Sequence, residues 1–203
     1  MMQADELRTY LPKYLSEENY QTLLGELKSF PDNIDKRFYT SSLDQTVLFQ
    51  GDGYDILPVV DLAHMERGSK YKPALIISNT CDMDLSNKRF YPSSIMYAPL
   101  ISIDKYKMTL LSSEISETKI ETHLSDIRKQ RVSSILYLPA DSKIQESIVF
   151  LDRVYNIDNR FIDRKTLSLH RLFSLSDYGF YLLMFKMSVH FCRIRECVNR
   201  GHQ

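Results

Sequence analysis

The sequence feature that most constrains the fold is the stretch of residues 72–84, KPALIISNTCDMD. Its centre, residues 74–77, is an uninterrupted apolar run with β-branched members, which a proline precedes and Ser-Asn-Thr follows. A short apolar run between turn residues is typical of a strand in the core. Cys81, Asp82 and Asp84 then follow the strand, so its carboxyl end presents a thiol and two carboxylates. We expect a functional site of this chain at that end.

Charge and hydropathy restrict the classes of partner. The chain has 203 residues, of which 43% are hydrophobic, and it carries 26 Lys and Arg against 26 Asp and Glu. With no net charge, binding to nucleic acid must rely on a local basic patch. The sequence contains no run of roughly eighteen apolar residues, and its first residues, MMQADE, lack the basic and then apolar order of a secretion signal. We expect a cytoplasmic protein that does not engage a membrane.

The cysteines do not indicate a disulfide framework or a metal site. Their number is odd, which suits a reducing compartment. Four candidate ligands lie close in sequence, but their spacing contains neither C-x2-C nor H-x3-H: His190, Cys192, Cys197 and His202. We therefore expect no metal and no cofactor.

The hydrophobic period changes at residue 46. In the first thirty residues the apolar residues have helical spacing, and Ser16 can cap a helix that Pro31 ends. A polar, irregular segment follows at 32–45, which we expect Phe38 and Tyr39 to attach to the body. After it, short apolar and β-branched runs alternate with turn residues, which predicts strands and hence a small barrel or a tightly curled sheet. The predicted strands are residues 46–49, 54–60, 74–78, 94–98, 134–138 and 147–155.

Two further helices are predicted. Residues 113–131 place Ile120, Leu124 and Ile127 on one face, which indicates a helix inserted between strands. A last helix begins at Ser176 and is apolar nearly all round to at least Arg195, so it is buried against the sheet or a second subunit. The expected fold class is α+β, mainly β. The expected divisions are a helical amino-terminal appendage at 1–45, a barrel with its inserted helix at 46–158, and a carboxyl-terminal helical segment at 159–203.

Several motifs occur in an informative order. VVDL at 59–62 is the end of an early predicted strand and contains an acidic residue, and ERGSKY at 66–71 is a charged loop. Two later strands follow, KPALIIS at 72–78 and MYAPLIS at 96–102. In order and spacing these segments resemble the MazF/PemK toxin family of small SH3-like barrels, and residues 147–158 are similar to that family's late strand. The resemblance covers about residues 51–158. It implies an SH3-like barrel to which the terminal helices are additions.

The resemblance also implies a function. Members of the family are dimers that cut single-stranded RNA without a metal, and an arginine and a threonine act on the scissile phosphate. Here Lys72 stands at the arginine position and Ile101 at the threonine position, with Ser102 beside it, and Arg67 or Ser102 could substitute if the loop register shifts. A lysine is a point charge and not a bidentate clamp. The implied partners are single-stranded RNA, a second copy of the chain, and an antitoxin or another subunit of a bacterial toxin–antitoxin or phage-defence module.

These considerations give two sets of candidate site residues. The candidate catalytic residues are Lys72, Arg67, Ser102, Cys81 and Asp82. The candidate substrate-binding residues are His64, Glu66, Lys70, Asn79 and Thr80.

The turn at Cys81 and Asp82 departs from the toxin pattern and resembles a subgroup with a Ser-x-x-Cys-Asp end to this strand. One interpretation is a thiolate assisted by His64 or His123, although a neighbouring carboxylate disfavours the thiolate. Another is that Asp82 and Asp84 hold a cation. The structural interpretation is that Cys81 packs as a small apolar residue and Asp82 caps the turn.

A second function from a different class remains open. The missing arginine and threonine, the balanced charge and the apolar last helix would also suit a non-catalytic interaction module. Such a protein would use its barrel and its terminal helices to dock a protein partner.

Overall fold

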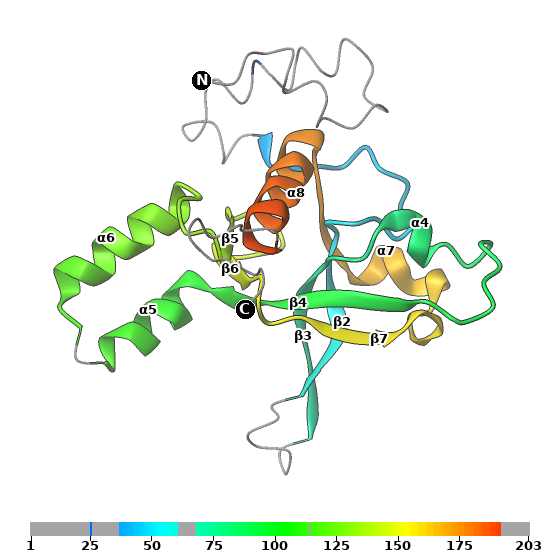
Figure 1. Cartoon of the computed structure of the whole chain (residues 1–203), viewed down its shortest axis with the longest axis horizontal. Helices are drawn as coiled ribbons and strands as arrows, with labels where there is room; N and C mark the ends of the chain where they lie inside the picture. Colours follow the sequence, from blue (N-terminus) through cyan, green and yellow to red (C-terminus); the bar gives the residue numbers. More distant parts are fainter. Residues whose placement is uncertain (1–24, 26–36, 61–67, 114, 192–203) are drawn as a thin grey trace, which may run out of the picture.

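The computed structural model describes residue 25 and residues 37–60, 68–113 and 115–191 (Figure 1). The helices predicted before residue 37 lie outside the described residues, as does the predicted end of the last helix beyond residue 191. Phe38 is buried and Tyr39 packs against the main core, as predicted for the segment that joins the amino-terminal region to the body.

The described chain is a mixed α+β structure with eight strands and five α-helices. The strands are β1 (Tyr39–Thr40), β2 (Gly53–Val60), β3 (Ser69–Ile76), β4 (Ser94–Ser102), β5 (Ile135–Leu138), β6 (Ser147–Phe150), β7 (Tyr155–Asp158) and β8 (Arg171–Leu175). The helices are α4 (Thr80–Met83), α5 (Ile103–Leu111), α6 (Glu117–Arg128), α7 (Leu167–His170) and α8 (Asp177–Phe191), with 3-10 turns η2 (Asn159–Phe161) and η3 (Arg164–Thr166).

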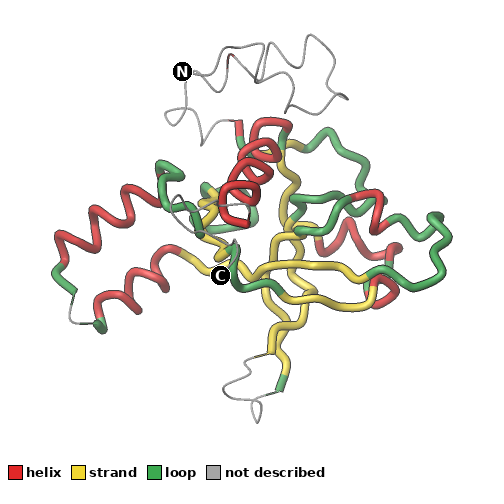
Figure 2. Tube along the Cα trace, in the orientation of Figure 1, coloured by secondary structure: helices red, strands yellow, loops and turns green. Residues whose placement is uncertain are grey.

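The strands form one antiparallel sheet in the order β1-β8-β2-β3-β4-β6-β5, with β7 paired to β4. The sheet is not closed, which corrects the expectation of a barrel. The amino half of β4 pairs with β3 and β7, whereas its carboxyl half pairs with β6. In the described sheet, no strand pairing joins the edge strands β1 and β5, although the Tyr39 hydroxyl of β1 donates to the carbonyl of Pro139, directly after β5, at 2.7 Å. Figure 2 shows the strands crossing the centre of the molecule, with helices on both sides.

β3 is the strand predicted from the apolar run, and it lies between two hydrophobic cores. Leu75 and Ile77 belong to the core formed with β5, β6, β8, α6 and α8. Ala74 and Ile76 belong to a second core, which includes Met83 of α4 and side chains of β2, β4 and α7. Consecutive side chains of a strand point to opposite faces, so burial on both faces requires an apolar run and not an alternation.

Three of the predicted elements differ from the observed ones, and two observed strands were not predicted. Residues 46–49 form a turn and not a strand, because the carbonyl of Val47 accepts a hydrogen bond from Arg171 and the amide of Phe49 donates to Asp52. The region of the inserted helix contains two helices, α5 and α6, of which only the second was predicted. The strand predicted at 147–155 is divided into β6 and β7. The short strands β1 and β8 were not predicted.

The last helix begins where the sequence predicts. The Ser176 hydroxyl accepts the amide of Gly179 at 3.1 Å, which caps α8. One face of α8 is buried against the main core, whereas Met184, Phe185 and Phe191 are exposed. The predicted burial is therefore correct for one face of the helix.

Candidate nucleic-acid interface

The turn after β3 is built as a self-contained unit. Asn79 caps α4 by accepting the amide of Cys81 at 2.9 Å. Thr80 accepts the amide of Gln50 at 3.0 Å through its hydroxyl, and the Gln50 side chain donates to the carbonyl of Ile77 at 2.7 Å. Asn87 donates to the carbonyl of Cys81 at 2.6 Å. Asn79 and Thr80, two of the five residues assigned to substrate binding, therefore hold the turn through their side chains. Their contact with a substrate stays a prediction.

Cys81 and Asp82 are both exposed, which corrects the structural interpretation of this turn. Cys81 is a free, exposed cysteine and does not pack as an apolar residue. Asp82 forms an ion pair with Arg89, and the capping role belongs to Asn79.

The chemical interpretations of the turn find little support in its geometry. His123 lies on α6 and bonds the Tyr106 hydroxyl at 3.0 Å, at the opposite end of the molecule from α4 (Figure 1). Asp84 accepts the amide of Ser86 at 2.8 Å, and hydrogen bonds to Ser86 lower its pKa. Within the described residues, no group of three or more His, Cys, Asp or Glu side chains could hold a metal ion.

Lys70 and Lys72 lie on the first half of β3, which extends beyond the rest of the sheet. β3 pairs with β4 only at 74–76, so the earlier residues pair with β2 alone. We call this two-stranded extension, residues 57–60 and 69–72, the β2–β3 arm; it projects at the bottom of Figure 1. Both lysines are exposed. Their positions, two residues apart, place their side chains on the same face of the strand.

The other candidates near the arm lie in the loop that joins its strands. His64, Glu66 and Arg67 belong to residues 61–67, outside the described part of the chain. Their assigned roles stay predictions.

Ser102 lies at the far end of β4, where it caps α5 by accepting the amide of Lys105 at 3.3 Å. Residues 96 and 97 of β4 pair near α4, and the six residue steps from Met96 to Ser102 therefore separate Ser102 from the turn by ~20 Å of strand. The structure thus distributes the described candidate residues over three places: the arm, the α4 turn and the β4–α5 junction. Only the members of the α4 turn are brought together.

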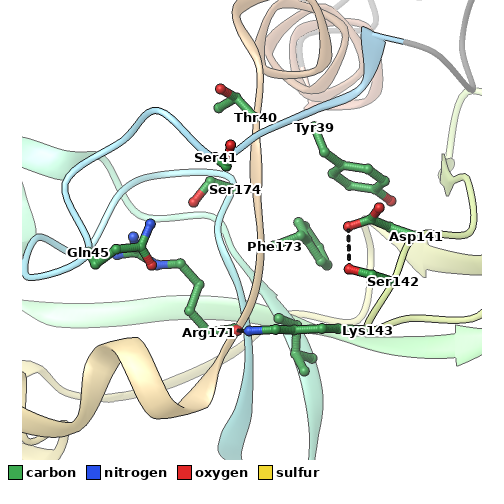
Figure 3. Close-up of a pocket in the computed structure, with 11 residues that line it drawn as sticks. Tyr39, Thr40, Ser41, Gln45, Asp141, Ser142, Lys143, Arg171, Phe173 and Ser174 are labelled. Carbon is green, nitrogen blue, oxygen red and sulfur yellow. Dashed lines mark hydrogen bonds between the residues drawn. The ribbon is translucent and has the colours of Figure 1, made fainter.

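A pocket of about 390 Å³ lies elsewhere, beside the end of β8 (Figure 3). β8 pairs with β1 only at residues 174 and 175, and the pocket occupies the edge that β1 leaves open. Its walls are Tyr39, Thr40, Ser41, Gln45, Asp141, Ser142, Lys143, Arg171, Leu172, Phe173 and Ser174.

The cations at this pocket are already engaged. Lys143 donates to the carbonyl of Arg171 at 2.9 Å, and Asp141 lies on the same rim. Figure 3 shows Arg171 reaching from β8 toward Gln45 and away from Asp141. The pocket therefore does not have the free positive charge of a phosphate site.

Arg171 is instead the centre of a buried polar cluster. Its guanidinium donates to the Tyr54 hydroxyl at 2.8 Å and to the carbonyl of Asp44 at 3.0 Å, and it lies 3.2 Å from an Asp52 carboxylate oxygen. Burial raises the pKa of Asp52, although Ser174 and Arg171 oppose the rise. Burial also raises the pKa of Tyr54. This cluster joins β2, β8 and the turn at 44–49, so its role is structural.

Sequence reasoning missed this cluster because its members are far apart along the chain. It also missed a signal that is visible in the sequence, the run Lys-Arg-Phe-Tyr at 88–91, which combines basic and aromatic residues. Both aromatic side chains of that run are exposed.

Comparisons with known proteins do not assign the chain to a family. No protein-family model matches it, and no curated protein does. It is similar to a solved structure described as an endoribonuclease from Mycobacterial species, with 10% sequence identity and a TM-score of 0.36 over 70% of this chain and 89% of that chain. At this identity and TM-score the likeness carries no argument about function. In the described part of the chain, no helix is both long enough and apolar enough to cross a bilayer.

Proposed function

We propose that this protein binds single-stranded RNA through the basic side chains of the β2–β3 arm. The observation that carries the proposal is the position of Lys70 and Lys72, exposed on one face of a two-stranded extension. Among the described residues, neither lysine is engaged in an ion pair. Unpaired cations on a projecting two-stranded extension are available to phosphate oxygens. Contacts between cations and phosphates supply most of the affinity of sequence-independent RNA binding.

The wider proposal follows the motif resemblance. The chain would be a MazF/PemK-like protein of a bacterial toxin–antitoxin or phage-defence module that acts on RNA in the cytoplasm. It would do so as a homodimer, or with an antitoxin or another defence subunit. Lys72 at the arginine position and the ordered segments from 59 to 102 support this proposal.

Cleavage is the reaction that the resemblance implies, and it is less directly supported than binding. Lys72 would hold the non-bridging oxygens of a phosphate while the RNA 2′-hydroxyl loses its proton and attacks the phosphorus. The P–O5′ bond then breaks, the 5′-oxygen leaves with a proton, and a 2′,3′-cyclic phosphate remains. Ser102, the candidate hydroxyl, lies at the other end of β4 and is engaged as a helix cap. Next to the arm in sequence, His64 is the remaining candidate for the proton transfer, and Arg67 is a candidate for stabilising the charge on the phosphate oxygens.

Fluorescence anisotropy with a labelled single-stranded RNA tests binding. We expect the Lys70→Ala/Lys72→Ala variant to bind more weakly and to reduce the slope of log affinity against log salt by about 1.4, which is about 0.7 for each lost phosphate contact. The matched control is Lys119→Ala/Lys129→Ala, which removes the same charge from the exposed surface of α6 and the residue that follows it. Equal affinity and equal slope for the two variants would refute the role of the arm.

A gel assay of the same RNA in EDTA tests cleavage. We expect metal-independent cutting that Lys72→Ala reduces at least tenfold, with Ser102→Ala and Cys81→Ser close to wild type. If the protein binds the RNA tightly but does not cut it, the endoribonuclease proposal is refuted and the RNA-binding proposal stands.

The non-catalytic interaction module is the second candidate, and α8 is the feature that favours it. Met184, Phe185, Val189 and Phe191 expose apolar area on the face of α8 opposite the core. Light scattering tests this candidate: a dimer that Phe185→Asp converts to a monomer supports a docking face, whereas a wild-type monomer argues against self-association.

A further inference from the structure

The most exposed aromatic side chains among the described residues lie in the loop between α4 and β4. Phe90 is fully exposed and Tyr91 is 84% exposed. Burial of a large aromatic side chain stabilises a fold, so this fold gives up that stabilisation at two neighbouring positions. Adjacent large side chains left in water are typical of a surface that binds something.

The loop that carries these rings is held at both ends. After α4, the backbone of Asn87 donates to the carbonyl of Asp84 at 3.2 Å, and its side chain donates to the carbonyl of Cys81. Before β4, Ser93 accepts two hydrogen bonds from Asn159, at 3.0 Å through its carbonyl and 2.9 Å through its hydroxyl. The loop therefore presents the rings on a partly ordered scaffold, which lowers the entropy lost on binding.

Asn159 begins η2, so a second pair of basic and aromatic residues lies beside the same loop. Arg160 is exposed, and Phe161 is 54% exposed. The loop and the carboxyl end of β7, from which η2 continues, lie together at the right of Figure 1. We call this surface the aromatic corner. Its members are Lys88, Arg89, Phe90, Tyr91, Arg160 and Phe161.

The cations of the corner are accessible to a ligand. Arg89 pairs with Asp82 and Arg160 pairs with Asp158, and all four side chains are at least 45% exposed. Exposed pairs of this kind contribute little stability, so phosphate oxygens can compete for the guanidinium groups. Lys88 adds an exposed cation in the same loop.

Flat rings with adjacent guanidinium groups match the chemistry of unpaired nucleotides. Unstacked bases bind on aromatic side chains and on arginine planes, and their phosphates bind to cations. We propose that the aromatic corner is a base-stacking subsite for single-stranded RNA, with bases on Phe90 and Tyr91 and phosphates at Lys88 and Arg89. This inference rests on the proposed RNA binding and adds a second contact surface to the β2–β3 arm.

Anisotropy with a labelled oligouridylate RNA tests the subsite by substitution. We expect Phe90→Ala and Tyr91→Ala each to weaken binding about tenfold, because one stacked base is lost in each case. Phe90→Tyr and Tyr91→Phe should bind as wild type, since both keep a ring. The control is Met108→Ala, which removes an exposed apolar side chain from α5 and should leave RNA affinity unchanged.

A fluorescence measurement tests stacking itself. The chain contains no tryptophan, so Phe90→Trp introduces a single reporter. We expect saturating RNA to quench its emission. Emission that does not change while anisotropy reports full binding would overturn the subsite.

The outcomes separate this inference from the function on which it rests. If the wild-type protein binds no RNA, the proposed function itself fails. If Lys70→Ala/Lys72→Ala weakens binding but Phe90→Ala/Tyr91→Ala does not, the arm stands and the subsite alone is overturned. If Phe90→Ala/Tyr91→Ala keeps full RNA affinity but changes the mass measured by light scattering, the corner contacts a second copy of the chain, and the subsite is again overturned.

Discussion

Two aspartate–arginine pairs of this chain lie in opposite environments. The side chains of Arg171 and Asp52 are 4% and 0% exposed, whereas those of Arg89 and Asp82 are 45% and 52% exposed. The buried guanidinium also binds Tyr54 and two carbonyls of the turn at 44–49. The exposed pair includes Arg89, a member of the aromatic corner. The same two functional groups therefore stabilise the fold at one place and remain accessible to a ligand at the other.

Removal of one partner of the buried pair should have the largest effect. We expect Asp52→Ala to lower the free energy of unfolding by about 3–5 kcal/mol, because it leaves the Arg171 cation in the interior without a carboxylate. Urea unfolding followed by circular dichroism measures the change. If Asp52→Ala does not fold, Asp52→Asn keeps the hydrogen-bond acceptor and gives the same comparison at a smaller cost. A loss below 1 kcal/mol would show that the cluster does not hold β2 and β8 together.

Lys186 extends the comparison to a buried cation without a carboxylate partner in the described structure. Its ammonium donates to the carbonyls of Gln130 and Val132 at 2.9 and 2.6 Å, and burial lowers its pKa to about 8. The folded protein therefore releases this proton at a lower pH than the unfolded chain. Between pH 8 and the ordinary lysine pKa, the unfolded state binds more protons, so this group makes the protein more stable as pH rises.

The variant Lys186→Met isolates this contribution from other groups that titrate in the same range. Relative to Lys186→Met, the wild-type protein should gain up to about 3 kcal/mol between pH 8 and 10.5. Urea unfolding at several pH values measures the difference. Parallel stability profiles for the two proteins would contradict the lowered pKa.

At the α4 turn, the cap should contribute more than the ion pair. We expect Asn79→Ala to cost about 1 kcal/mol, because the amide of Cys81 loses its acceptor. Thermal unfolding measures the loss. Asn79→Asp, which keeps an oxygen acceptor, is the control and should retain most of the stability.

The exposed pair should give the smallest effect on stability. Asp82→Asn should change the free energy of unfolding by less than about 1 kcal/mol, as exposed pairs do. Because it frees Arg89, it should also strengthen RNA binding, which anisotropy measures. A stability loss comparable to that of Asp52→Ala would remove the contrast between the two pairs.

The sequence predicted the elements whose signals are local. The run at 74–77 predicted a core strand, because a strand buried on both faces must be apolar at every position. Ser176 predicted the start of α8 through the capping preference of a hydroxyl. The division of the chain at residues 45 and 158 stays a prediction.

The errors come from partners that are distant in sequence. The stretch 46–49 has strand-like composition but is held as a turn by Arg171 and Asp52. β8 begins with that arginine, so its pattern does not indicate a buried strand. The candidate residues were assigned to one site because they are close in sequence or match the toxin motifs. In the structure, the carboxyl half of β4 pairs with β6, and Ser102 at its end lies away from α4.

By itself, the sequence determined the core strand and the helix cap, because periodicity and capping act over a few residues. The tertiary structure decided that the sheet stays open, since β6 pairs with the carboxyl half of β4 and extends the sheet beyond it. It also decided which charges are buried. Arg171 is tolerated inside because a carboxylate and carbonyls from other segments contact it, and the fold brings these groups together.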